Sequence, residues 1–145
     1  VLGHSLDELL SLAVVNFVAP IALTKLFLDH VPRGGTVVFV ITAGIHVLMS
    51  KLPIYGASKI ALHYAVKALR EELKPRGIRV VAVYPGGVLT EFHKRGGGEP
   101  PRFSVTAERV AEAVVKAVKR GSGEVYVPSY LKILKILGPL LPKLF

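Results

Sequence analysis

The stretch "YGASKIALHYAVKALREELKPRGIRVVAVYPGG", residues 55–87, decides the fold of this chain. Apolar residues recur at helical spacing over its first part, until Pro75 and Gly77 end the helix. The valine-rich run 78–84 follows at once, and "PGG" breaks it. A helix that leads directly into a buried strand is the repeating unit of a parallel α/β sheet. We expect the inward-facing side of this helix to be formed by Ile60, Ala61, Tyr64, Ala65, Ala68, Leu69 and Leu73.

A second helix and a second strand precede this unit. Ser5 and Glu8 form a capping-box pattern before a periodic apolar run that lasts to Pro32, so we expect one long helix, bent at Pro20. The glycine-bounded run "TVVFVIT", residues 36–42, has no polar alternation. It predicts a strand that is buried on both faces, as in a parallel sheet.

A third helix and a third strand follow. We expect the helix over 106–120, with Thr106 as its N-cap, and the strand over 123–128. The alternation of helix and strand along the chain predicts an α/β fold with a parallel sheet and right-handed crossovers. The last residues, 129–145, carry lysines, many leucines and no acid, and predict a basic amphipathic tail. We expect the third helix to face inward with Val110, Ala113, Val114, Ala117 and Val118.

The composition limits the class of protein. With 145 residues, 51% of them hydrophobic, the chain is long enough for one globular domain. The absence of cysteine excludes disulfides and a thiolate nucleophile, and we expect a cytoplasmic protein. Asp7, Lys25 and Lys51 interrupt the apolar runs, so we expect no membrane-spanning segment. The net charge of +9 indicates affinity for acidic surfaces but names no chemistry.

Tyr55 and Lys59 form the first candidate for chemistry. A free tyrosine has a pKa of about 10 and is a poor proton donor or acceptor at neutral pH. A lysine four residues later on the same helical face can stabilise the phenolate and lower that pKa. Tyr55 could then act as a general acid or base. A tyrosine and a lysine at this spacing also occur by chance, as a core aromatic beside a solvated charge.

Four segments together resemble the short-chain dehydrogenase/reductase family. The resemblance covers the chain from about Ser5 to about Pro128, in the family's order and at compatible spacings. It implies the second half of that family's fold, a partial Rossmann-like parallel sheet with long flanking helices over residues 1–128, with 129–145 as a separate tail. It also implies hydride transfer between a nicotinamide and an alcohol or carbonyl. The matching segments are "VVNFVAP", "GGTVVFVITAG", "YGASK" and "VVAVYPGGVLTEF".

The resemblance implies a role for each matching residue. Tyr55 would exchange a proton with the substrate oxygen, and Lys59 would lower the Tyr55 pKa and bind the nicotinamide ribose. Asn16 would hold a water of the proton relay, at a carbonyl opened by the helix bend. The nicotinamide and pyrophosphate would be bordered by Pro85, Gly86, Val88 and Thr90.

The sequence departs from the family pattern at the catalytic serine. The family has this serine thirteen residues before the tyrosine, where this chain has Thr42. Threonine keeps the hydroxyl and adds a methyl group that stiffens χ1. A shift by one residue would instead place Ile41 there, with no hydroxyl, and Ser50 in the following loop is a further substitute.

A larger departure concerns the cofactor. The family carries a glycine-rich turn after its first strand, followed by a residue that selects NAD or NADP. Nothing in this sequence resembles it, since "GGGEP" at 96–100 follows no strand and opens no helix. We therefore expect a chain that begins just after the family's fourth strand. We expect the cofactor to be NAD or NADP, and the sequence does not decide between them. The strand at 36–42 would be left as an exposed apolar edge of the sheet.

Three alternatives remain open for function and partners. The chain is a family oxidoreductase for a small alcohol or carbonyl, which the apolar loop 45–52 indicates to be hydrophobic. Alternatively, it is a non-catalytic half-domain that self-associates, since in the family the helices at 5–30 and 55–74 pair with their symmetry mates. The third is a peripheral membrane contact by 131–145. The scattered basic residues argue against nucleic-acid binding, and the five histidines show no metal-ligand spacing.

Overall fold

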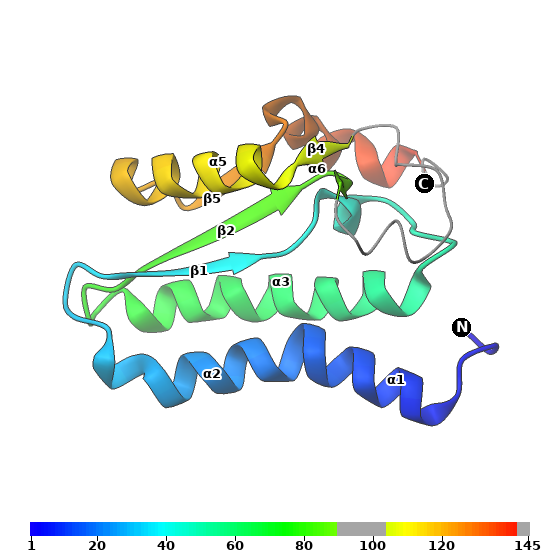
Figure 1. Ribbon diagram of the computed structural model, residues 1–145, viewed down its shortest axis with the longest axis horizontal. Helices are drawn as coiled ribbons and strands as arrows, with labels where there is room; N and C mark the ends of the chain where they lie inside the picture. Colours follow the sequence, from blue (N-terminus) through cyan, green and yellow to red (C-terminus); the bar gives the residue numbers. More distant parts are fainter. Residues whose placement is uncertain (90–103, 142–145) are drawn as a thin grey trace.

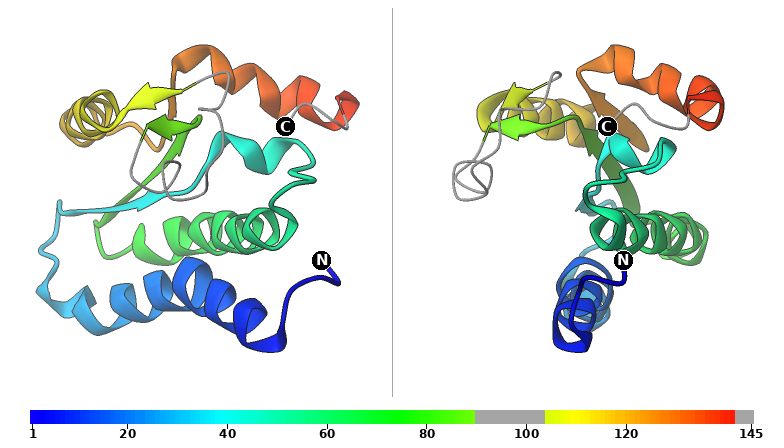
Figure 2. Two further views of the ribbon diagram at one scale, coloured as in Figure 1. Left: turned by 45° about the vertical axis from the view of Figure 1, so that its right-hand side comes forward. Right: turned by 90° about the vertical axis from the view of Figure 1, so that its right-hand side faces the viewer.

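The computed structural model describes residues 1–89 and 104–141, and every structural statement below refers to them. Four layers follow one another in Figures 1 and 2. Helix α5 covers one face of a small sheet, α3 covers the other face, and the helix formed by α1 and α2 packs on the far side of α3. This arrangement confirms the predicted α/β class.

The sheet has three parallel strands in the order β1-β2-β5. Their bounds are β1 Thr36–Val40, β2 Arg79–Pro85 and β5 Glu124–Val127. All three agree with the predicted strands to within a few residues. A second, two-stranded parallel pair joins β3, Val88–Leu89, to β4, Val105–Thr106, and the sequence did not predict it.

Strand β1 lies at one edge of the sheet, as predicted. Its burial is one-sided at the carboxyl end, because Phe39 is buried in the core between the sheet and α3 while Val40 is 49% exposed. The expectation that this strand is buried on both faces is therefore wrong at Val40, since no described element covers that side chain.

The first helix is continuous from Leu6 to His30 but not uniform. It consists of α1 Leu6–Ala13, a π-helical turn η1 Val14–Val18, α2 Ala19–Phe27 and a 3₁₀ turn η2 Leu28–His30. The Ser5–Glu8 capping box is present with both of its hydrogen bonds. The irregular turn immediately precedes Pro20, at which the bend was expected, because proline has no N–H for the helical ladder.

By length and composition, the helix Leu6–His30 could cross a membrane. The expectation that charges exclude such a segment is therefore wrong. The reason is that Asp7, Glu8 and Lys25 lie toward the two ends of the helix and leave residues 9–24 without a charged side chain. Core helices of soluble proteins pass the same test, but they are mostly buried, whereas this helix packs along α3 on one side and has no fully buried residue among those described.

Helix α3, Pro53–Leu73, was predicted almost to its ends, and Leu73 and Leu69 pack in the core as predicted, but other residues of its predicted inward side do not. Leu62, Val66 and Leu73 are buried against the sheet, whereas Ile60 is 50% and Tyr64 76% exposed. The helix is enclosed by the sheet and by the first helix, and these two residues lie on the side that neither covers. The prediction selected residues because they are apolar, and the side of the helix that it gave is therefore rotated relative to the side that is buried.

Helix α5, Ala107–Arg120, covers the second face of the sheet with four of the residues predicted to face inward, Val110, Ala113, Val114 and Ala117. The Thr106 hydroxyl accepts a hydrogen bond from the Arg109 amide, so Thr106 is the N-cap, as expected. Gly121 ends the helix in the left-handed region, at φ +72°, where glycine costs least.

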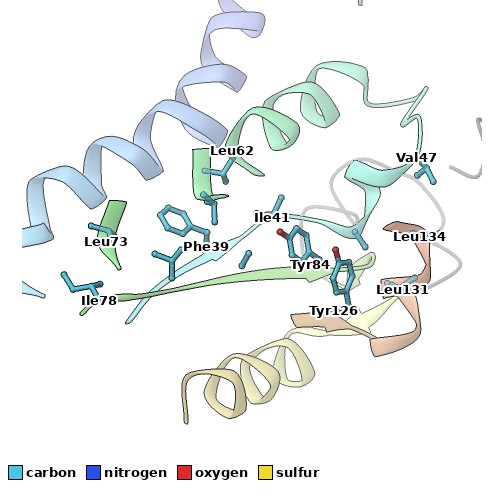
Figure 3. Packing of buried hydrophobic residues seen from close by; sticks show 14 residues of the cluster. Phe39, Ile41, Val47, Leu62, Leu73, Ile78, Tyr84, Tyr126, Leu131 and Leu134 are labelled. Atoms are coloured by element: carbon cyan, nitrogen blue, oxygen red, sulfur yellow. The ribbon is translucent and has the colours of Figure 1, made fainter. Parts of the chain in front are cut away.

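The C-terminal segment packs on the fold through one side. It is formed by η4 Ser129–Ile133, α6 Leu134–Leu137 and η5 Gly138–Leu140. Leu131 and Leu134 are buried in the main core beside Tyr126 (Figure 3), and Lys135 forms an ion pair with Glu124 at 2.6 Å.

Candidate active site

Tyr55 and Lys59 lie on the first turns of α3, on the side that faces the sheet. The Lys59 ammonium nitrogen is 5.8 Å from the centroid of the Tyr55 ring. Burial raises the pKa of Tyr55, and burial lowers the pKa of Lys59. The lowering of the Tyr55 pKa that the resemblance implies is therefore not seen with these two groups alone. The four-residue spacing on the helix nevertheless places Tyr55 and Lys59 side by side, as predicted.

The Lys59 ammonium also reaches the sheet. It donates a hydrogen bond of 3.2 Å to the carbonyl oxygen of Val40, the last residue of β1. This bond fixes the lysine between the start of α3 and the end of β1.

Thr42 is the second residue after the end of β1 and is 8% exposed. Its hydroxyl accepts a hydrogen bond from the Gly44 amide at 3.1 Å and donates one to the Pro85 carbonyl at 3.4 Å. The first bond makes Thr42 the N-cap of the 3₁₀ turn η3, Ala43–His46. The structure thus places a hydroxyl at the position thirteen residues before Tyr55.

The two alternatives to Thr42 lie elsewhere. Ile41 is 2% exposed, and its side chain belongs to the apolar core between the sheet and α3, as Figure 3 shows. Ser50 is exposed in the loop that leads to α3. Thr42 is therefore the hydroxyl that the fold holds in a buried, hydrogen-bonded position.

Asn16 lies in the middle of the π-helical turn η1, which packs against α3. In a regular α-helix its carbonyl would accept a hydrogen bond from residue 20, but Pro20 has no N–H. The Ala19 amide bonds back to Val14, five residues earlier, in the pattern of a π-helix. Pro20 therefore cannot supply the hydrogen bond that the Asn16 carbonyl would accept in a regular α-helix.

The predicted cofactor residues lie where β2 ends. Pro85 is buried, and the Gly86 amide donates to the Val127 carbonyl at 2.8 Å, which ties this turn to β5. Val88 begins β3. Thr90 and the glycine-rich segment 96–100 lie outside the described residues.

The carboxyl ends of the strands bring these residues to one end of the sheet. Thr42 follows β1, Gly86 follows β2, and the first turn of α3 with Tyr55 lies at the same end (Figure 1). In parallel α/β sheets, ligands bind outside the carboxyl ends of the strands. The arrangement combines a phenol, an ammonium and a buried hydroxyl, a set suited to proton transfer at an alcohol or carbonyl oxygen.

A cluster of two histidines and two tyrosines was not predicted. His46 binds the hydroxyl of Tyr126, and His63 binds that of Tyr84. These four residues are far apart in sequence and meet only through the tertiary fold, so no local pattern indicated the cluster. Among the described side chains, no group of three or more His, Cys, Asp or Glu is placed to hold a metal ion.

Residues 3–98 match the family model described as short chain dehydrogenase. An uncharacterized oxidoreductase of Mycobacterium tuberculosis is 34% identical over 111 residues, which cover 77% of this chain and 43% of that protein. The human 17-beta-hydroxysteroid dehydrogenase type 2 is 29% identical over 132 residues, 90% of this chain and 33% of that protein. The chain thus spans less than half the length of these relatives.

Solved structures show the same fold. A short chain dehydrogenase from Burkholderia cenocepacia in complex with NADP superposes with a TM-score of 0.81 at 23% identity, over 95% of this chain and 59% of that one. A carbonyl reductase from Pseudomonas aeruginosa superposes with a TM-score of 0.65 at 26% identity, over 89% and 57%. The partial Rossmann-like sheet implied by the sequence resemblance is confirmed.

Proposed function

The chain belongs to the short-chain dehydrogenase family, and from this premise we propose that it supplies the acid–base part of a nicotinamide-dependent oxidoreductase site. The observation that supports the proposal is the pairing of Tyr55 with Lys59, whose ammonium binds the carbonyl of Val40, two residues before the buried Thr42 hydroxyl. These are the groups that oxidation of an alcohol, or reduction of a carbonyl, requires on the protein side.

Tyr55 is the proposed proton carrier. In alcohol oxidation its phenolate takes the hydroxyl proton as the C–H hydride leaves; in carbonyl reduction its hydroxyl returns that proton to the oxygen. The Thr42 hydroxyl holds the same oxygen through a hydrogen bond, and the Lys59 charge favours the phenolate. Because burial now raises the Tyr55 pKa, the approach of Lys59 to the phenol oxygen is the step that prepares the base.

Asn16 is proposed to pass protons onward. Its carbonyl, to which Pro20 cannot donate the regular helical hydrogen bond, would bind a water between the first helix and α3. Such a water would link the Lys59 ammonium to solvent.

The cofactor proposed is NAD or NADP, which accepts or donates the hydride when bound. The residues at the end of β2 fit its nicotinamide end, because Gly86 carries no side chain and allows close approach of the backbone. Lys59 would bind the ribose, and Pro85, Val88 and Thr90 would border the ring and its phosphates. None of the described residues distinguishes NAD from NADP.

The substrate proposed is an apolar alcohol or ketone. Leu48 and Leu52 lie in the loop between Thr42 and Tyr55, and they are 57% and 44% exposed. Exposed leucines beside polar catalytic groups suit a ligand that is largely hydrocarbon around one oxygen.

Titration of the purified chain with NADH and with NADPH, followed by nicotinamide fluorescence, tests the proposal. We expect saturable binding of one or both, weakened in Lys59→Met because the ribose contact is lost. Lys74→Met, at the exposed C-terminal end of the same helix, is the matched control and should bind as the parent does. A folded chain that binds neither nucleotide would overturn the proposal.

A second candidate is self-association without catalysis. The exposed Ile60 and Tyr64 on α3 and the exposed Leu10, Val14 and Val18 on the first helix support it. Such apolar side chains on two adjacent helices suit a helical interface between two copies. The exposed Ile133 and Ile136, near Lys132, support a contact of the C-terminal segment with a membrane surface less strongly, because the patch is small.

A further inference from the structure

Four aromatic side chains form a polar cluster inside the fold. The rings of Tyr84 and Tyr126 stack with their centroids 4.6 Å apart and an angle of 16° between their planes. The Nε2 atom of His46 lies 2.8 Å from the Tyr126 hydroxyl, and the Nδ1 atom of His63 lies 2.9 Å from the Tyr84 hydroxyl. The two imidazole centroids are 6.3 Å apart. Figure 3 shows the two tyrosines side by side in the core.

Burial makes these hydrogen bonds necessary. Tyr84 is 1% and Tyr126 is 7% exposed, so neither hydroxyl can turn to bulk water. A buried hydroxyl without a partner is costly, and each histidine supplies that partner. These two hydrogen bonds therefore fix the positions of the His46 and His63 side chains and also satisfy the buried tyrosine hydroxyls.

The cluster connects the elements that carry the proposed site. His46 is the last residue of η3, which Thr42 caps. His63 lies one helical turn after Lys59 on α3. Tyr84 directly precedes Pro85, whose carbonyl accepts the Thr42 hydrogen bond. The rings thus link η3, α3 and the ends of β2 and β5.

Backbone packing holds η3 from another direction. A methyl group added at Gly138 would lie 2.1 Å from the carbonyl oxygen of His46. The C-terminal segment therefore presses directly on the backbone of the residue whose side chain binds Tyr126.

Both imidazoles are surrounded by other titratable groups. Burial lowers the pKa of His46, and His63 and Lys135 lower it further, against the opposing effect of Glu124. Burial also lowers the pKa of His63, with Lys67 next in effect; Lys135 and Arg70 act in the same direction, and Glu124 opposes them. These groups come from η3, α3, β5 and α6, and together they favour two neutral imidazoles at neutral pH.

We propose that His46 is a positioning residue: by binding Tyr126 while neutral, it holds η3 and the Thr42 hydroxyl in place against β2, and its protonation releases them. A protonated His46 could still donate to the Tyr126 hydroxyl, but its charge would lie beside Lys135 and His63 with only Glu124 opposed to them, and this unfavourable charge is the driving force for release. The inference rests on the proposed function in so far as Thr42 belongs to the site.

Hydrogen exchange of the Gly44 amide tests this directly, because that amide donates to the Thr42 hydroxyl. Protection factors, corrected for intrinsic exchange, would be compared at about pH 7.5 and about pH 5, on either side of the ordinary histidine pKa. We expect protection in the parent to fall by about tenfold or more at the lower pH, as expected when protonation is coupled to opening.

Variants separate the hydrogen bond from the charge. In His46→Gln the amide can still bind the Tyr126 hydroxyl but cannot be protonated, so the fall in protection between the two pH values should be much smaller than in the parent. His4→Gln, at an exposed histidine near the N-terminus, should retain the parent's pH response. An unchanged pH response in His46→Gln would overturn the proposal.

A measurement on the parent chain keeps the proposal testable if His46→Gln does not fold. NMR titration of the imidazole signals would give the protonation of His46, and the Gly44 protection should fall in parallel with it. Protection that persists once His46 is protonated would overturn the inference. The experiment needs no nucleotide, so a failure of nicotinamide binding would be seen separately and would reject the proposed function alone.

Discussion

The hydroxyl of Thr42 lies 3.4 Å from the carbonyl oxygen of Pro85 and thereby joins the end of β1 to the end of β2. The Thr42 hydroxyl oxygen also accepts a hydrogen bond of 3.1 Å from the Gly44 amide. A residue proposed to hold the substrate oxygen is therefore also a structural link in the apo chain.

Replacement of Thr42 by valine should lower stability, because a nearly isosteric side chain leaves the buried Gly44 amide without its acceptor. The expected loss in free energy of unfolding is about 1–3 kcal/mol. Urea unfolding followed by circular dichroism would measure it. Thr42→Ser, which keeps the hydroxyl, should lose much less, and equal losses in the two variants would contradict this account of the bond.

Tyr55→Phe should leave the fold intact and remove the group that is proposed to transfer the proton. Among the described residues, the Tyr55 hydroxyl has no hydrogen-bond partner, so thermal unfolding should shift little. Where alcohol oxidation is measurable, the rate should fall by about 10²–10⁴, the usual contribution of a general acid or base. Full activity of Tyr55→Phe would exclude the tyrosine as proton carrier.

Gly138→Ala should destabilise the chain, since the new methyl group would overlap the carbonyl oxygen of His46. Overpacking of this kind costs about 1–3 kcal/mol. The matched control is Gly3→Ala, where an added methyl group meets no atom within 4 Å. Denaturant unfolding of both variants would show whether the C-terminal segment is packed against η3 as tightly as the geometry indicates.

Acid should destabilise the fold through its histidines. Burial lowers the pKa of His46 and of His63 below the ordinary value of 6.5. As pH falls through 6.5, the unfolded chain binds protons before the folded one does, so stability present above that pH is lost progressively below it. Thermal unfolding across pH 5–8 should show this slope.

The double variant His46→Gln, His63→Asn serves as the control for this pH effect. Each amide retains a hydrogen-bonding nitrogen near the position of the bonded imidazole nitrogen, but neither side chain titrates. The slope between about pH 5 and 6.5 should therefore flatten. A slope equal to that of the parent would place the acid sensitivity elsewhere.

Tyr64→Glu tests association through the helices. If two copies pair through the exposed sides of α3 and the first helix, a charge at this 76% exposed position should shift the chain toward monomer in sedimentation velocity. Ile136→Glu changes an equally exposed apolar residue on the C-terminal segment and should leave the helical pairing intact. Dissociation by Ile136→Glu alone would move the interface to that segment.

Local sequence patterns were sufficient for the main elements. Valine-rich runs bounded by glycine and proline predicted the strands, and Thr106 and the Ser5 capping box predicted two helix starts. The buried side of α3 was missed because it depends on which elements enclose the helix. Tertiary contacts such as the one between His46 and Tyr126 join residues far apart in sequence, and no local pattern records them.

The hydrogen bond from Lys59 to Val40 has a consequence for the open edge of β1. The Gly35 carbonyl and the Ile41 amide both bond to β2, so by alternation the backbone groups of Val40 face away from it. Lys59 occupies the last carbonyl of that free edge. A strand that joined β1 would donate an amide to the Val40 carbonyl and so release the Lys59 ammonium, which is the group proposed to bind the ribose. By thermodynamic reciprocity, the strand and the ribose would then each change the affinity for the other by the same factor.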